Sequence, residues 1–178
     1  QQSVSSHQST MKVVYILVWG LLLANVDATK NATETKCKAN ENADAWAAIT
    51  GPRSGKFLLY KSTSEDAKRC AYFTVPTRSH DRSADFTSGY KEGPTWYTDS
   101  DFVEAAGNKL TFTDVRGKTK SATVLFSDST KCHVTRRYGD VEFWKHSDAN
   151  ESSIACCQVV FRKERGDTPA KEMQKKCE

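Results

Sequence analysis

Residues 131–144 have the sequence KCHVTRRYGDVEFW, which predicts two short strands joined by a turn at Gly139-Asp140. Successive side chains of a strand point to opposite faces of the sheet. One face of this hairpin then carries Cys132, Val134, Arg136, Val141 and Phe143, and the other carries His133, Thr135, Arg137, Glu142 and Trp144. The first face is mainly apolar. The second is polar and aromatic, as the interior of a barrel around a small ligand requires.

The start of the chain predicts export rather than structure. Residues 1–10 are rich in Ser and Gln and precede the first methionine, so we treat them as an upstream segment with no structural role. Residues 11–28 combine one lysine, an apolar run and a small-residue end, which is the pattern of a secretory signal peptide cleaved after Ala28. A membrane anchor is the alternative, but the run is short for a bilayer span. We expect a secreted domain at residues 29–178, a monomer with no membrane attachment.

The charge of the chain excludes one class of partner. The 26 Lys and Arg against 22 Asp and Glu leave a net charge of only +4. The basic residues are scattered in short pairs without interleaved aromatic residues, so no nucleic-acid site is expected.

All six cysteines follow the predicted signal peptide. An even number in a secreted chain predicts three disulfides, although counting alone leaves their pairing open. Zinc is the alternative, but no Cys-x-x-Cys pair exists and the histidines are not spaced as ligands, so we expect no metal and no cofactor. Asn31 and Asn150 lie in glycosylation sequons, which predicts two exposed segments.

The hydrophobic pattern predicts an all-β domain with two helices. Short strands separated by turn residues are expected at 56–61, 70–75, 84–90, 95–98, 109–113 and 121–127, followed by the hairpin. About eight strands at this spacing favour an antiparallel barrel closed around one small ligand. Residues 43–49 predict a short helix that covers the barrel, residues 153–163 an amphipathic helix on its outside, and residues 166–178 a polar tail.

Three blocks of the sequence resemble the tick salivary lipocalins, and among them the soft-tick moubatin-like group with its complement-inhibiting, eicosanoid-binding members. The blocks are 44–46 with 57–63 and 67–70, then 132–134 with 142–144, and last Cys156-Cys157 with Cys177. The match is poor over residues 76–110. The resemblance implies an eight-stranded lipocalin barrel with the disulfides Cys37–Cys156, Cys70–Cys177 and Cys132–Cys157.

The resemblance also implies a ligand class. Family members scavenge small mediators, either biogenic amines or eicosanoids, and the amine binders carry an acidic residue directly after the cysteine that matches Cys132. Here that residue is His133, which also matches a ligand-contacting histidine of the eicosanoid binders. A carboxylate would neutralise an ammonium, whereas an imidazole pairs better with a carboxylate. We therefore expect sequestration of a host lipid mediator such as leukotriene B4, thromboxane or a related fatty acid, to suppress inflammation or haemostasis.

The expected ligand-binding residues follow from the same match. Phe57 and Trp144 are expected to line an apolar channel, and Lys68 stands where the eicosanoid binder has a carboxylate-holding arginine. Thr135 stands where that protein has an aspartate that holds a ligand hydroxyl. Glu142 keeps the alternative of a histamine or serotonin scavenger open. Arg136 and Arg137 are expected to be surface charges, one of which could close the barrel mouth.

The sequence bears on two other classes of function, catalysis and the binding of a host protein. A catalytic site is not expected, because no nucleophile elbow, paired-carboxylate motif or metal motif occurs in the sequence. A host complement protein is the alternative partner, bound through the loops. The loop at 145–155 is shorter than in the complement inhibitor, which argues against this partner.

Overall fold

The computed structural model describes residues 37–177 except residues 41 and 78–80. The upstream segment 1–10, the signal peptide 11–28 and Asn31 lie outside the described residues, so these three assignments stay predictions.

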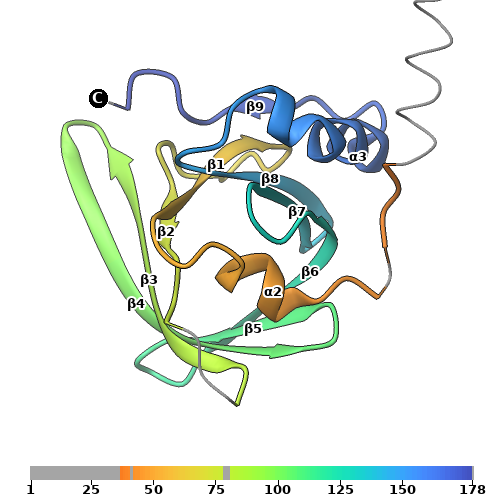
Figure 1. Ribbon diagram of the computed structural model, residues 1–178. Coiled ribbons are helices and arrows are strands. Elements are labelled where there is room, and N and C mark those ends of the chain that lie inside the picture. The colour runs from red at the N-terminus through yellow and green to blue at the C-terminus, as the bar shows by residue number, and fades with distance from the viewer. Residues whose placement is uncertain (1–36, 41, 78–80, 178) are drawn as a thin grey trace, which may run out of the picture. The chain divides into compact units, whose positions relative to one another are not determined.

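One antiparallel sheet closes on itself to form a barrel (Figure 1). Each strand from β2 to β8 pairs with the next, and β1 closes the barrel because it pairs with both β8 and β2. The strands are β1 Lys56–Ser62, β2 Tyr72–Thr74, β3 Ser83–Glu92, β4 Thr95–Ala106, β5 Lys109–Thr113, β6 Thr119–Ser127, β7 Cys132–Arg137, β8 Asp140–His146 and β9 Lys171–Glu172. The predicted eight-stranded lipocalin barrel is confirmed, and β9 is a short addition to the edge of β1.

The short helix α2 (Ala45–Thr50) covers one end of the barrel. Asp44 caps it by accepting a hydrogen bond from the Ala47 amide, and the chain turns away at Gly51. Trp46 and Ile49 are buried in the interior core, which also contains Phe57, Phe73, Phe86, Val103, Leu110 and Val124. The predicted helix at 43–49 is thus confirmed, and it forms the floor of the barrel.

A second helix, α3 (Ala155–Arg165), follows the one-turn helix η1 (Ser152–Ile154) and packs on the outside of β7 and β8. Its buried residues Cys157, Val160 and Phe161 join Val134, Val141 and Phe143 in a separate core. Alternation along β7 and β8 therefore serves two cores, one beneath α3 and one inside the barrel.

The three disulfides pair as the resemblance implied. They are Cys37–Cys156, Cys70–Cys177 and Cys132–Cys157, and the described part of the chain has no free cysteine. Two of them hold the adjacent cysteines of α3, one to the segment before α2 and one to β7. The third holds the C-terminal tail to Cys70, two residues before β2.

Two elements differ from the prediction. The strand expected at 95–98 continues to Ala106, because Asp99, Ser100 and Asp101 form a strand paired with β3 rather than a turn. The tail was expected only as a polar segment, but Lys171 and Glu172 pair with β1, and Met173 behind them is buried. In both places, pairing with a neighbouring strand outweighs the low strand propensity of polar residues.

Candidate functional site

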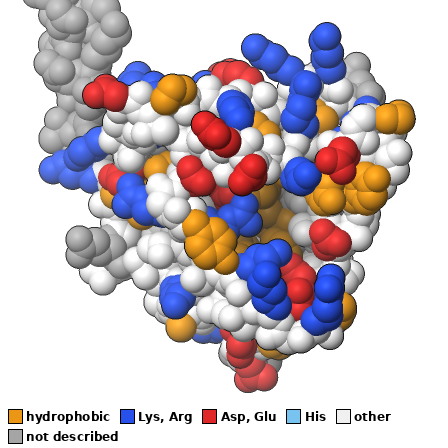
Figure 2. Space-filling model, turned by 180° about the vertical axis from the view of Figure 1, so that it is seen from behind, with side chains coloured by type: hydrophobic (Ala, Val, Ile, Leu, Met, Phe, Trp, Pro, Cys, Tyr) orange, Lys and Arg blue, Asp and Glu red, His pale blue; other side chains and the backbone are white. Residues whose placement is uncertain are grey.

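A cavity of about 510 Å³ occupies the barrel between α2 and the opposite end. Its walls are formed mainly by the apolar side chains Ile49, Leu59, Ala71, Phe73, Phe86, Leu110, Phe112, Ala122 and Trp144. From the side opposite α2, Figure 2 shows a hollow with apolar side chains inside and charged side chains of both signs around it. The volume lies in the range typical of small-molecule sites.

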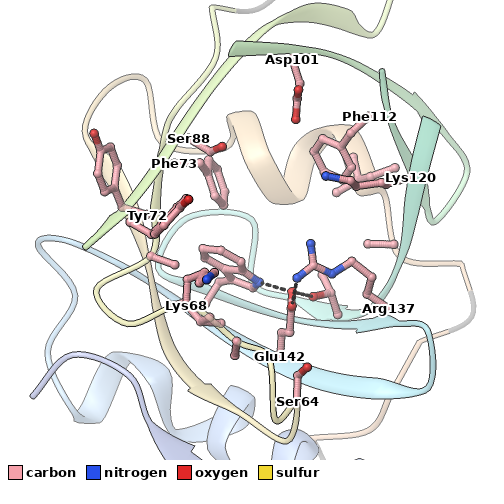
Figure 3. A pocket seen from close by; sticks show the side chains of 18 of the residues that line it. Ser64, Lys68, Tyr72, Phe73, Ser88, Asp101, Phe112, Lys120, Arg137 and Glu142 are labelled. Atoms are coloured by element: carbon pink, nitrogen blue, oxygen red, sulfur yellow. Dashed lines mark hydrogen bonds and ion pairs between the residues drawn. The ribbon is translucent and has the colours of Figure 1, made fainter. Parts of the chain in front are cut away.

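Glu142 is the buried carboxylate of this cavity, with only 4% of its side chain exposed. Arg137 Nη2 lies 2.6 Å from Glu142 Oε1, and Trp144 Nε1 donates to Oε2 at 3.2 Å (Figure 3). The Thr135 hydroxyl lies opposite on β7 and donates to Oε2 at 3.4 Å. The negative charge is therefore neutralised inside the protein by one cation and two neutral donors.

His133 lies deeper, next to α2, and only 1% of the residue is exposed. Its ring contacts Phe57, Phe73 and Trp144, with centroids 4.7, 5.8 and 6.3 Å away. Burial lowers the pKa of His133 from 6.5 to about 3, against the opposing effect of a hydrogen bond with the Ala48 backbone. The imidazole is therefore neutral at physiological pH, and its buried Nδ1 has no hydrogen-bond partner among the described residues.

The other expected residues lie in different surroundings. Lys68 lines the cavity at its exposed end, where Nζ lies 3.2 Å from a Glu92 carboxylate oxygen and 5.5 Å from the centre of the Tyr90 ring. That hydrogen bond raises the pKa of Lys68 above its ordinary value. Phe57 does not line the cavity as we expected. It is buried behind Phe73 and His133, because its ring packs into the aromatic core above α2.

The structure brings in charged residues that the sequence analysis did not select. Arg136 and Arg137 were expected to be surface charges, one of which could close the barrel mouth. Arg136 points outward to Glu164 at 3.0 Å, whereas Arg137 points inward to Glu142. The alternation of the hairpin already placed Arg137 on the cavity face. In Figure 3, Asp101 and Lys120 also point into the cavity. The aspartate was missed because residues 99–101 resemble a turn.

Asn150 lies exposed in the loop before η1. Its side-chain oxygen accepts hydrogen bonds from the Ser152 hydroxyl and the Ser153 amide. Exposure agrees with the expected sequon, and glycosylation stays a prediction. Within the described residues, no group of His, Cys, Asp and Glu is arranged to hold a metal ion, and no helix is long and apolar enough to cross a membrane.

Comparison with known proteins agrees with the fold and the cavity. A family model described as tick histamine binding protein matches residues 33–177. The chain belongs to this family of tick lipocalins. Moubatin of Ornithodoros moubata is 26% identical over 168 residues, which cover 92% of this chain and 97% of that protein.

Solved structures extend the comparison. A crystal structure of AM182 in complex with serotonin has a TM-score of 0.69 and 31% identity, and covers 79% of this chain and 95% of that one. Apocrustacyanin C1 matches with a TM-score of 0.53 at 12% identity over 78% of this chain and 89% of its own, so it shares the fold alone. Tick lipocalins of this family are carriers of small ligands, and the cavity is where this chain has room for one.

Proposed function

We propose that this tick lipocalin sequesters a host lipid mediator that ends in a carboxylate, such as leukotriene B4, a thromboxane or a related fatty acid. The observation that carries the proposal is the contact between Arg137 and Glu142. An amine ligand needs a buried carboxylate to balance its charge, but the buried carboxylate of this cavity is already neutralised. A carboxylate ligand instead needs a cation.

The apolar wall supports the hydrocarbon part of such a ligand. Phe73, Phe86, Phe112 and Trp144 come from four different strands and surround the same space. Burying an acyl chain there would contribute about 0.8 kcal/mol for each methylene group. A chain of ordinary fatty-acid length would therefore obtain most of its affinity from this wall.

The polar groups support the other end of the ligand. Arg137 binds Glu142 through one nitrogen, so the rest of its guanidinium can donate to a ligand carboxylate. Lys120 and Lys68 add positive charge at the lining. The neutral His133 and the Thr135 hydroxyl offer partners for a hydroxyl group along the chain. This arrangement would bind one ligand molecule for each protein molecule, without turnover.

A biogenic amine is the second candidate, and one observation favours it. The lining contains five carboxylates, namely Asp66, Asp99, Asp101, Asp140 and Glu142, against the three cations Lys68, Lys120 and Arg137. The serotonin complex of AM182 shows that a related barrel accepts an amine. An ammonium group that reached Glu142 here would have to displace Arg137.

Titration calorimetry of the delipidated mature protein decides between the candidates. The panel is leukotriene B4, a thromboxane analogue, arachidonate, histamine and serotonin. We expect submicromolar binding of at least one lipid and no heat with the amines. Binding of amines alone would contradict the proposal. No binding in the whole panel would also contradict it, and would favour a protein partner such as a complement component.

The same proposal includes secretion. The predicted signal peptide and the three disulfides both suit an oxidising, extracellular location such as saliva. The domain is proposed to act there as a monomer, outside any membrane.

A further inference from the structure

Arg136 and Arg137 are neighbours in sequence but lie on opposite faces of β7. Arg136 forms an ion pair with Glu164 of α3, outside the barrel. Arg137 is the last residue of β7 and reaches into the cavity, yet 40% of its side chain is exposed. The same side chain therefore contacts a buried carboxylate and solvent at once.

The two members of the cavity ion pair differ in their freedom to move. Glu142 is almost completely buried, and Trp144 and Thr135 hold its second oxygen. Arg137 has a flexible side chain at the mouth, beside the exposed turn at Tyr138 and Gly139. If a ligand cation arrives, the arginine can move into water while the carboxylate stays in place.

A buried carboxylate without a cation is unfavourable, because it loses its hydration and gains no compensating charge. In the described structure, Arg137 is the cation within ion-pair distance of Glu142. An amine ligand that paired with Glu142 would need the carboxylate that Arg137 already contacts. An amine must therefore compete with a group that is covalently attached to the protein.

We propose that Arg137 is an internal counter-ion that determines the charge of the ligand, because its contact with Glu142 excludes amines and presents a guanidinium to carboxylates. This inference rests on the proposed function, since it explains how a barrel with a buried carboxylate selects an anionic lipid. Removal of the guanidinium should change the preference of the site from a carboxylate ligand to an ammonium ligand. Glu142 would keep two neutral donors and no cation, which favours an ammonium ligand.

The test compares Arg137→Gln with the matched control Arg136→Gln, using calorimetry with arachidonate and with serotonin. Loss of a charge-assisted hydrogen bond predicts arachidonate binding weaker by about tenfold or more in Arg137→Gln. Serotonin binding should become stronger by about tenfold or more in the same variant. The control should behave as the wild type does toward each ligand, because Arg136 lies outside the barrel.

A double variant identifies the group that an amine uses. In Arg137→Gln with Glu142→Gln, the gain in serotonin affinity should disappear, because the carboxylate that attracts the ammonium is gone. Arg137→Lys keeps the charge without the planar fork, so it should retain the preference for arachidonate at reduced affinity. The lysine variant also tests the inference if Arg137→Gln fails to fold.

The outcomes separate the inference from the proposed function. If the wild type binds arachidonate but Arg137→Gln changes neither affinity, the inference is wrong and the proposed function stands. Gain of serotonin binding by Arg137→Lys, or a gain that persists in the double variant, would also overturn the inference. If the wild type binds only serotonin, the proposed function is wrong. The inference would then be wrong too, because Arg137 would neither exclude amines nor attract a carboxylate.

Discussion

Glu142 on β8 and His133 on β7 are both buried polar residues, but each avoids an uncompensated buried charge in a different way. The Glu142 carboxylate is paired with Arg137, whereas burial lowers the pKa of His133 to about 3, so its imidazole is neutral. The two residues differ because they lie at different depths in the barrel. Glu142 lies within reach of a cation anchored at the mouth, and His133 lies against α2, among aromatic rings. A neutral imidazole fits an apolar ligand chain better than a charged one would.

The lowered pKa of His133 predicts a dependence of stability on pH. The unfolded chain takes up a proton near pH 6.5, but the folded protein does so only near pH 3. The neutral, buried imidazole therefore causes no loss of stability above pH 6.5. The free energy of unfolding falls as the pH decreases from 6.5 toward 3. At pH about 4.5 the loss in free energy of unfolding would be about 2–3 kcal/mol.

Urea unfolding of the wild type and of His133→Asn at pH about 7 and about 4.5 measures this contribution. Between pH about 7 and about 4.5, the free energy of unfolding of the wild type should fall by about 2–3 kcal/mol more than that of the variant. The other groups titrate alike in both proteins. Equal losses would show that His133 is protonated in the folded state or is accessible to water.

At the level of elements, α2 closes the barrel with a single capped helix of six residues. The Asp44 carboxylate both caps this helix and forms an ion pair with Arg82, so it connects the floor of the barrel to the start of β3. Such a short helix has little stability of its own. Its position depends on the cap and on the burial of Trp46 and Ile49.

Replacement of Asp44 separates its two roles. Asp44→Ala should lower the free energy of unfolding by about 1 kcal/mol, the usual effect of losing an N-cap. Asp44→Asn should recover most of that loss, because asparagine also caps helices and the exposed ion pair contributes less than about 1 kcal/mol. Urea unfolding of the three proteins gives the comparison. Equal loss in both variants would assign the effect to the ion pair instead of the cap.

The disulfides of the tail and of α3 are expected to differ in their contributions. Cys70 and Cys177 are separated by 107 residues, and Cys132 and Cys157 by 25. Loop entropy predicts that replacing Cys70 and Cys177 by serines lowers the free energy of unfolding by about 5 kcal/mol. For Cys132 and Cys157 the predicted loss is about 3.5 kcal/mol. Thermal unfolding of the two double-serine proteins should therefore give the lower Tm for the tail variant. The reverse order would mean that packing of α3 outweighs loop entropy.

Most elements could be predicted from the sequence because their signals are local. Alternation in the hairpin predicted which side chains enter the cavity. The pattern of residues 153–163 predicted an amphipathic helix, and the buried face of α3 consists of Cys157, Val160 and Phe161. The length of β4 and the existence of β9 could not be predicted in this way. Both depend on a partner strand distant in sequence or on a turn propensity that tertiary pairing overrides.

The contacts inside the site were harder to predict than its residues. Arg137 was visible on the cavity face, but its contact with Glu142 depends on the direction of a long side chain at the end of a strand. Phe57 was expected to line the channel, and packing against Phe73 and His133 determines its place instead. Alternation along a strand predicts which face of the sheet a side chain lies on. Packing against other side chains then determines whether it lines the cavity or is buried behind them.

At the level of the whole molecule, the protein has two hydrophobic cores, one beneath α3 and one inside the barrel. The core beneath α3, with two of the disulfides, holds the outside of β7 and β8, so the inner side of the same strands can carry polar groups. The interior core lies toward α2 and leaves the cavity between itself and the charged mouth. This arrangement suits a carrier for a ligand with an apolar body and one polar end.

The most direct measurement is calorimetry of the wild-type protein with arachidonate and with arachidonyl alcohol, which has the same chain but no carboxylate. Recognition of the carboxylate by a cation predicts that the acid binds tighter by about tenfold or more. Equal affinities would show that the barrel selects only the hydrocarbon chain, and tighter binding of the alcohol would show repulsion by the acidic lining. Either of these results would contradict the account.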